Sequence, residues 1–326
     1  MEINYRKTNT FIVMSSRRSF IRQSALAAGA LAVHPALNAM LAKGSGLEIS
    51  LAQWSLHKQL FAGQLDHLDF AAKAKKDFGI SAVEYVTTFF GSKKVNFKEA
   101  GKDKNYLNEM LKRSKDNGVV NHLIMVDGEG NLAQLDEKER LQAIDNHKKW
   151  VEAAKFLGCK TIRVNLAGEG SKEDKRNAGA DSLGRLGDFA KTMNINVIVE
   201  NHGGDSSNAA WLASVMKQAN RKNVGTLPDF GNFCISGAWG GTEGGCKEKY
   251  DTYLGVTELM PFAKGVSAKT YDFKEDGEES TMDYKRLIDI VKAAGFKGYV
   301  GIEYEGAKFS EEEGIRKTKQ LLEKYI

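Results

Sequence analysis

Acidic side chains follow several of the short apolar runs in this sequence. Glu200 and Glu303 each end a strongly apolar run, and Asp229 follows Leu227 and Pro228. Side chains at the carboxyl ends of neighbouring parallel strands converge on one space, where unscreened carboxylates repel one another. A divalent cation removes that cost, so the pattern indicates a metal site. An all-oxygen ligand set suits Mg or Mn, and an added imidazole admits Zn or Co.

Further polar residues occupy equivalent positions after other apolar runs. They are Glu84, Arg163, Asn165, His202, Lys269 and Glu305. Each of the acidic residues and His202 could also have a purely structural role, and the sequence does not decide between the two roles. Glu84 would then pair with a cation at the strand ends, Asp229 would cap the following helix, Glu305 would face solvent, and His202 would be a hydrogen-bonded histidine without a ligand role.

Several of these residues suit the binding of a sugar. Trp54 ends the first apolar run and stands near Gln53 and His57, which combines an apolar ring with polar neighbours. Such a surface matches the CH face and the hydroxyl edge of a sugar. We therefore expect the following residues to contact substrate: Trp54, His57, Glu84, Arg163, Asn165 and His202.

Eight short apolar runs alternate with segments of helical periodicity, which predicts a parallel sheet wrapped by helices. The runs are Leu47 to Trp54, Ile80 to Val86, Val119 to Val126, Thr161 to Leu166, Asn196 to Asn201, Val224 to Phe230, Gly265 to Thr270 and Tyr299 to Tyr304. Helical segments end at Gly79, Gly158 and Gly295 just before a run, as expected of glycine helix stops. Eight units predict a (β/α)8 TIM barrel over residues 43–326. An open doubly wound sheet is the alternative, but the chain lacks the Gly-x-Gly-x-x-Gly turn that would favour it.

The N-terminal residues differ from the rest of the chain. Arg17 and Arg18 are followed by Ser-Phe-Ile, a mild apolar run from Ala25 to Val33, and small residues before position 42. This order of basic, apolar and small-residue regions predicts a removable twin-arginine (Tat) signal at residues 1–42. We therefore expect the Tat export machinery as a partner, a periplasmic location and no stable membrane anchor.

Charge and cysteine content narrow the function classes. The chain of 326 residues carries a net charge of +5, and the predicted signal, with five Lys or Arg and one Glu, accounts for +4 of it. A body near +1 without a basic stretch is unsuited to binding a phosphate backbone, so we expect no nucleic-acid partner. Three cysteines are too few for a disulfide framework, and the spacing of Cys234 and Cys246 leaves their pairing open.

The ordered set of strand-end motifs resembles a known group. The resemblance rests on four motifs: 197-VIVENHGG-204, 227-LPDFGNF-233, 266-VSAK-269 and 301-GIEYE-305. These are similar to the xylose isomerase-like barrels of the sugar phosphate isomerase/epimerase family in the AP endonuclease 2 superfamily. That family includes ketose 3-epimerases and inosose dehydratase. The resemblance spans the chain from about Leu47 and implies one divalent metal ion held by four strand-end residues, of which Glu200, Asp229 and Glu303 match three.

The fourth position departs from the family pattern. Where the family usually has His-Ala-Lys, this chain has Ser267-Ala268-Lys269, which leaves a three-carboxylate site completed by water or by a replacement ligand such as His202. The resemblance implies proton transfer at a carbon next to a carbonyl, with Glu200 and Glu303 as the acid-base pair. Lys269 would contact a sugar oxygen or stabilise an enolate, or else form an ion pair with a neighbouring carboxylate.

The implied activity is that of a sugar isomerase or epimerase. Export favours an unphosphorylated sugar or keto-sugar as the substrate, since phosphorylated sugars are cytoplasmic intermediates. The same chemistry with a leaving group beta to the carbonyl would make a lyase or dehydratase. A non-catalytic periplasmic sugar-binding protein would keep the pocket without metal, and an endonuclease IV-like nuclease would need a histidine-rich, basic site that this sequence lacks. The sequence leaves homo-oligomer formation open.

Overall fold

The computed structural model describes residues 45–91, 96–242 and 245–326, and the predicted signal at 1–42 lies outside them. Eight parallel strands form one sheet in the order β6-β5-β4-β3-β2-β1-β8-β7. The strands are β1 (Leu47–Ala52), β2 (Ala82–Val86), β3 (Val120–Val126), β4 (Thr161–Val164), β5 (Asn196–Glu200), β6 (Val224–Leu227), β7 (Val266–Thr270) and β8 (Gly298–Tyr304). All eight predicted strands are confirmed, with ends that differ by a few residues.

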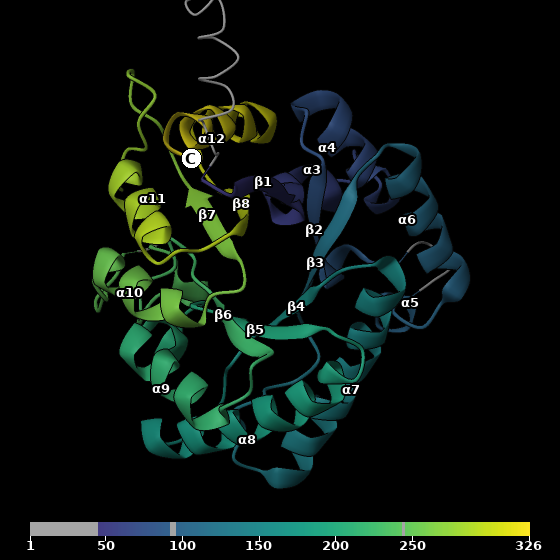
Figure 1. The fold of residues 1–326 in the computed structure, drawn as a ribbon, viewed down its shortest axis with the longest axis vertical. Coiled ribbons are helices and arrows are strands. Elements are labelled where there is room, and N and C mark those ends of the chain that lie inside the picture. The colour runs from purple at the N-terminus through teal and green to yellow at the C-terminus, as the bar shows by residue number, and fades with distance from the viewer. Residues whose placement is uncertain (1–44, 92–95, 243–244) are drawn as a thin grey trace, which may run out of the picture. The chain divides into compact units, whose positions relative to one another are not determined.

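Helices lie between the strands and surround the sheet (Figure 1). They are α3 (His57–Phe61), α4 (Phe70–Phe78), α5 (Phe97–Ala100), α6 (Lys104–Asp116), α7 (Glu137–Leu157), α8 (Lys172–Lys191), α9 (Ala209–Ala219), α10 (Thr252–Leu259), α11 (Tyr284–Ala293) and α12 (Glu311–Tyr325). Short 3-10 turns include η1 (Gln53–Leu56), η3 (Thr87–Phe89) and η5 (Ala238–Gly240). Among the described residues, no helix is long and apolar enough to cross a membrane.

The sheet closes into a nearly complete barrel. β1 pairs with β2 on one side and with β8 on the other, which joins the first strand to the last. β6 and β7 are the ends of the strand order, and two isolated bridges close the gap: Thr226 of β6 pairs with Ala263 before β7, and Asp229 after β6 pairs with Ser267 of β7. The chain after β6 therefore runs beside β7, and this brings Asp229 next to Ser267. The predicted (β/α)8 barrel is confirmed and the open-sheet alternative is wrong.

Local sequence explains much of this architecture. Gly79, Gly158 and Gly295 follow α4, α7 and α11 with φ of 68°, 81° and 72°, as expected of residues that end helices in the left-handed conformation. Helical periodicity in the sequence predicts helices over Glu137 to Leu157, Ala209 to Ala219 and Glu311 to Tyr325, and α7, α9 and α12 have these bounds. A further helix is predicted from Ser182 to Met193, but α8 begins ten residues earlier, at Lys172. The apolar core fills the space between the strands and the surrounding helices.

A disulfide bond closes the segment after β6. Cys234 and Cys246, whose pairing the sequence left open, are bonded with their Cα atoms 5.8 Å apart. The bond spans the glycine-rich stretch from Gly237 to Gly245, which includes η5. Trp239 in η5 lies against His202 with ring centroids 5.2 Å apart, which places η5 near the carboxyl end of β5.

Candidate active site

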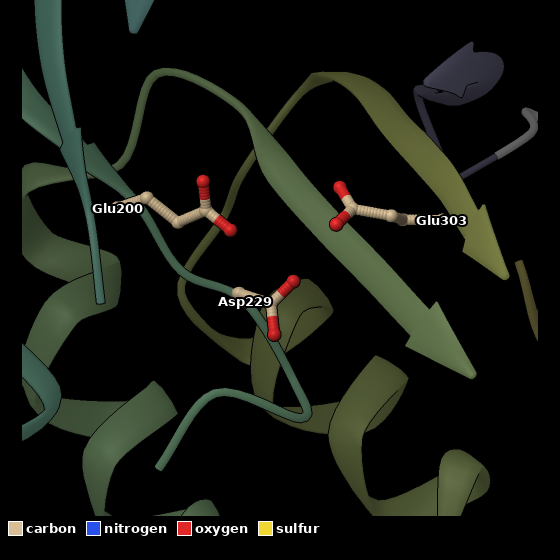
Figure 2. Close-up of side chains that lie close together, drawn as sticks. All are labelled: Glu200, Asp229 and Glu303. Carbon is tan, nitrogen blue, oxygen red and sulfur yellow. The ribbon is translucent and has the colours of Figure 1, made fainter. Parts of the chain in front are cut away.

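Three buried carboxylates converge at the carboxyl ends of the strands. Glu200 is the last residue of β5, Asp229 follows β6, and Glu303 lies in β8. Each contributes one oxygen to a group whose atoms all lie within 4.8 Å of one another. Figure 2 shows the three side chains pointing toward one another from separate segments. The structure thus brings together the three residues that the sequence predicts as metal ligands.

β7 supplies a hydroxyl and an ammonium group to this cluster. Ser267 and Lys269 are two residues apart, so both side chains face the barrel interior. Ser267 Oγ donates to Asp229 Oδ2 at 2.6 Å and lies 3.4 Å from Glu303 Oε2. Lys269 pairs with Glu303 in the register of the sheet, and its Nζ lies 3.0 Å from Glu303 Oε1. The ion-pair interpretation of Lys269 is therefore correct in this structure.

Burial and mutual repulsion change the ionisation of the carboxylates. Burial raises the pKa of Glu200 well above its usual range, and Glu303 and Asp229 add to this against the opposing charge of Arg163. Burial also raises the pKa of Asp229 to about 7, although Lys269 lowers it. For Lys269, burial lowers the pKa, but the nearby Glu303 carboxylate and two further carboxylates outweigh it and leave the pKa raised.

The cluster fits a divalent cation. All three candidate ligands are buried carboxylic acids, and burial raises the pKa of Glu200 and Asp229 by disfavouring the charged form, a penalty that a bound cation would offset. Ser267 stands where the family pattern has histidine, so the protein donors of this group are oxygens, which suit Mg or Mn. Asp229 Oδ1 accepts from the backbone N–H of Gly231 and Asn232 at 2.8 Å each, which holds this carboxylate in place.

Arg163 joins the carboxylate cluster to β3. Its Nε lies 2.9 Å from Glu200 Oε2, and its Nη1 lies 2.9 Å from Asp127 Oδ1. Asn165, two residues further on, donates from Nδ2 to Asp127 Oδ1 at 2.7 Å. Arg163 and Asn165 therefore face the same space, as predicted, and both are held by Asp127.

The hydrogen bonds of Asn165 determine which nitrogen of His202 carries hydrogen. Arg163 Nη1 donates to Asn165 Oδ1 at 3.0 Å, and His202 Nδ1 lies 2.9 Å from the same oxygen. Because a carbonyl oxygen only accepts, His202 Nδ1 donates. Burial first, and then the charges of Arg163 and Lys269, hold the pKa of His202 well below its usual value. The ring is therefore neutral, and Nε2 is left as the acceptor nitrogen.

Glu84 lies deeper in the barrel than its predicted role implies. Its side chain is 1% exposed and accepts from Ser50 Oγ at 2.6 Å. Gly301 in β8 makes room for it, since a Cβ atom there would lie 2.5 Å from Glu84 Oε1. The alternative in which Glu84 pairs with a cation is wrong, because its hydrogen-bond partner is a serine. Its predicted contact with substrate stays a prediction.

Trp54 is connected to the candidate metal ligands through Glu305 and Lys269. Trp54 follows β1 in η1 rather than ending the strand, and its Nε1 donates to Glu305 Oε1. Glu305 Oε2 lies 3.0 Å from Lys269 Nζ. The solvent-facing alternative for Glu305 is therefore wrong. His57 stacks on Trp54 with ring centroids 4.9 Å apart.

Sequence reasoning missed two residues of this site. Asp127 directly follows β3, so the rule that found the other strand-end residues would also have found it. Asn232 donates from Nδ2 to Glu200 Oε1 at 3.1 Å, and its backbone N–H binds Asp229. It lies in the irregular segment after β6, where no periodic pattern indicates the direction of a side chain.

The fold and the site together define a (β/α)8 barrel with an acidic, cation-suited centre at its strand ends. The family profile described as "Xylose isomerase-like TIM barrel" matches residues 71–325, and the chain belongs to that family.

Two solved structures illustrate the shared fold. A sugar phosphate isomerase/epimerase from Parabacteroides distasonis is 18% identical with a TM-score of 0.61, covering 86% of this chain and 94% of that one. A 3-keto-D-glucoside 4-epimerase from E. coli is 15% identical with a TM-score of 0.59, covering 85% and 98%. At these identities the likeness is one of fold.

A short stretch also matches a curated relative. The C-glycoside deglycosidase alpha subunit of Arthrobacter globiformis is 37% identical over 54 residues, which are 17% of this chain and 15% of that protein.

Proposed function

We propose that this protein is a metal-dependent sugar isomerase or epimerase that transfers a proton at a carbon next to a carbonyl group. The observation that carries the proposal is the convergence of Glu200, Asp229 and Glu303 within 4.8 Å. The epimerase and isomerase neighbours of the same fold support it. A divalent ion held by the three carboxylates would polarise the carbonyl and so acidify the adjacent carbon.

Glu200 and Glu303 are the proposed acid-base pair. They come from β5 and β8 and point toward one space, so a sugar between them would present one face to each carboxylate (Figure 2). One carboxylate removes the proton and the other returns it on the opposite face. Each positioned group contributes about 100- to 10,000-fold to the rate. Lys269 pairs with Glu303 at 3.0 Å, and we propose that it also donates to a substrate oxygen.

The charges of the site favour an unphosphorylated substrate. Arg163 pairs with Glu200 and Asp127, and Lys269 pairs with Glu303 and Glu305. Both of these cations are therefore already neutralised by carboxylates, whereas a phosphate group needs cations or N–H groups that are available to it. An unphosphorylated keto-sugar or keto-glycoside satisfies the site better than a sugar phosphate.

A lyase is the second candidate. The match to a C-glycoside deglycosidase subunit favours it, although that match covers only a small share of either protein. The same proton abstraction next to a carbonyl would expel a substituent at the beta position in place of returning the proton. The reactions diverge only after the first proton transfer, so Glu200 and Glu303 keep the same first step.

We also propose export of the protein to the periplasm through the twin-arginine route. The bond between Cys234 and Cys246 supports an oxidising compartment, because disulfides persist outside the reducing cytosol. The expected signal precedes the described barrel, which begins at residue 45.

Solvent deuterium exchange tests the proposed chemistry. The mature protein loaded with Mn or Mg is incubated in D2O with a panel of keto-sugars and keto-glycosides, and NMR follows the exchanging carbon. We expect deuterium to enter one position. Glu303→Gln should lower this exchange at least 100-fold while most of the metal is retained, since the amide keeps an oxygen ligand but cannot take a proton.

Glu152→Gln, an exposed position on α7, is the control and should exchange normally. Unchanged exchange in Glu303→Gln would move the base to another residue. Absence of both bound metal and exchange in the unaltered protein would favour a non-catalytic sugar-binding protein.

A further inference from the structure

Four aromatic rings gather at the strand ends beside the carboxylate cluster. Trp54 stacks with His57 and lies 6.0 Å from Phe61 and 5.8 Å from Phe89, measured between ring centroids. Phe61 and Phe89 meet edge to face at 5.0 Å. We call these four residues the aromatic platform. Phe61 is 62% exposed, although the rings of Trp54 and Phe89 lie against it.

The platform continues an apolar surface that begins inside the barrel. Trp54 and Phe89 pack against a buried cluster made of Ala52, Val86, Leu123, Met125, Ile198 and Leu227. Trp54 in η1 and Phe61 in α3 follow β1, and Phe89 lies in η3 after β2, so all three come from short helical segments that follow the carboxyl ends of strands. One apolar surface therefore extends from the barrel interior to the exposed ring of Phe61.

A chain of polar contacts joins the platform to the proposed catalytic carboxylates. Trp54 Nε1 donates to Glu305, Glu305 binds Lys269 at 3.0 Å, and Lys269 lies 3.0 Å from Glu303. The platform thus borders the site on the β1 and β2 side, and the candidate metal ligands lie on the β5 to β8 side. A ligand that spans both would be polar at one end and apolar at the other.

The chemistry of the platform selects an aromatic ring over a second sugar. The indole N–H of Trp54 is already bonded to Glu305, and His57 Nδ1 is bonded to the backbone oxygen of Trp54 at 2.7 Å. The platform therefore presents ring faces and edges in preference to hydrogen-bonding groups. Aromatic rings prefer offset or edge-to-face contacts with other rings, which an exposed phenylalanine provides. Exposed apolar surface beside a polar site is typical of a ligand-binding groove.

We propose that the aromatic platform binds the aromatic aglycone of a glycoside whose sugar lies at the carboxylate cluster. This inference rests on the proposed function, and it narrows the substrate class from keto-sugars in general to aryl glycosides. Phe61 is the residue that sets the preference for aryl over alkyl glycosides, because it is the most exposed ring of the platform.

Binding of two unreactive glycosides tests this proposal separately from catalysis. Phenyl β-D-glucopyranoside and methyl β-D-glucopyranoside lack a carbonyl, so neither can be enolised, and calorimetry measures their affinity for the metal-loaded mature protein. We expect the phenyl glycoside to bind roughly tenfold more tightly, as ring contacts of this kind allow. Phe61→Ser should remove most of this ratio, Phe61→Trp should keep it, and affinity for the methyl glycoside should not change.

The control is Leu254→Ser on α10, at a leucine that is 49% exposed, and it should keep the ratio. Equal affinities in the unaltered protein, or a ratio that survives Phe61→Ser, would overturn the proposal. A change of oligomeric state in Phe61→Ser, measured as the molecular mass of the particle in solution, would also overturn the proposal. It would assign the platform to an interface between copies of this chain. Absence of deuterium exchange with any keto-glycoside, while the ratio persists, would refute the proposed reaction and leave the platform's assignment standing.

Discussion

Replacing Glu84 by glutamine isolates the effect of one buried carboxyl group on stability. Glu84 is 1% exposed, and its Oε2 atom has no hydrogen-bond partner among the described residues. Glutamine keeps the shape and can still accept from Ser50, but it cannot ionise. The pKa of Glu84 is raised from 4.5 to about 7, mainly by burial and also by the charge of Glu303, against the opposing effects of Ser50 and Arg163.

The direction in which pH changes the free energy of unfolding follows from the number of protons that the folded and unfolded states bind. Between pH 4.5 and about 7 the folded protein holds a proton on Glu84 that the unfolded chain has released. The stabilising contribution of protonated Glu84 to the free energy of unfolding is therefore complete below pH 4.5 and is lost as pH rises through 7. At about 1.4 kcal/mol per pKa unit, the loss is on the order of 3 kcal/mol. At about 2.1 cal/mol/K of unfolding entropy per residue, a barrel that spans residues 45–326 would shift in Tm by about 5 °C.

Urea unfolding between pH 4.5 and 8, with EDTA present to exclude metal effects, gives the free energy of unfolding of both proteins. We expect the difference between Glu84→Gln and the unaltered protein to shift by about 3 kcal/mol in favour of the variant as pH rises. Subtraction removes the pH dependence that Glu200 and Asp229 contribute to both proteins. Parallel pH profiles would refute the reasoning, and Glu152→Gln shows the effect of losing a surface carboxylate.

Arg163→Gln should lower the free energy of unfolding by about 3 to 5 kcal/mol in EDTA, because it leaves the buried Glu200 carboxylate without its cation. Urea unfolding measures this, and Arg185→Gln, at an exposed pair with Asp181, should change the free energy of unfolding far less, because solvent screens that pair. An equal loss in both variants would contradict the role of Arg163. Replacing Arg17 and Arg18 together by lysine should retain precursor in the cytoplasm, as cell fractionation would show, and normal export would refute the signal assignment.

The elements of this fold are largely readable from local sequence. Alternation of apolar runs with helical segments predicts all eight strands, because the spacing of side chains in a strand or helix is set by neighbouring residues. Glu200, Asp229 and Glu303 are predictable for the same reason, since each closely follows an apolar run. Gly255 lies in the interior of α10, where a glycine weakens the helical pattern of the sequence. A Cβ atom there would lie 2.2 Å from the Phe233 ring, so the glycine serves a packing contact that no local pattern reveals.

The hydrogen bonds and ion pairs between side chains depend on the closed barrel and cannot be predicted from local sequence. The incomplete pairing of β6 with β7 places Ser267 against Asp229, and the order of the sheet places Arg163 between Asp127 and Glu200. These contacts depend on strand register and barrel closure, which join residues far apart in the chain. The acidic strand ends and the barrel that carries them can be predicted from the amino-acid sequence alone. The partners of each charge, and with them every pKa shift in the site, follow from distances that exist only after the barrel has closed.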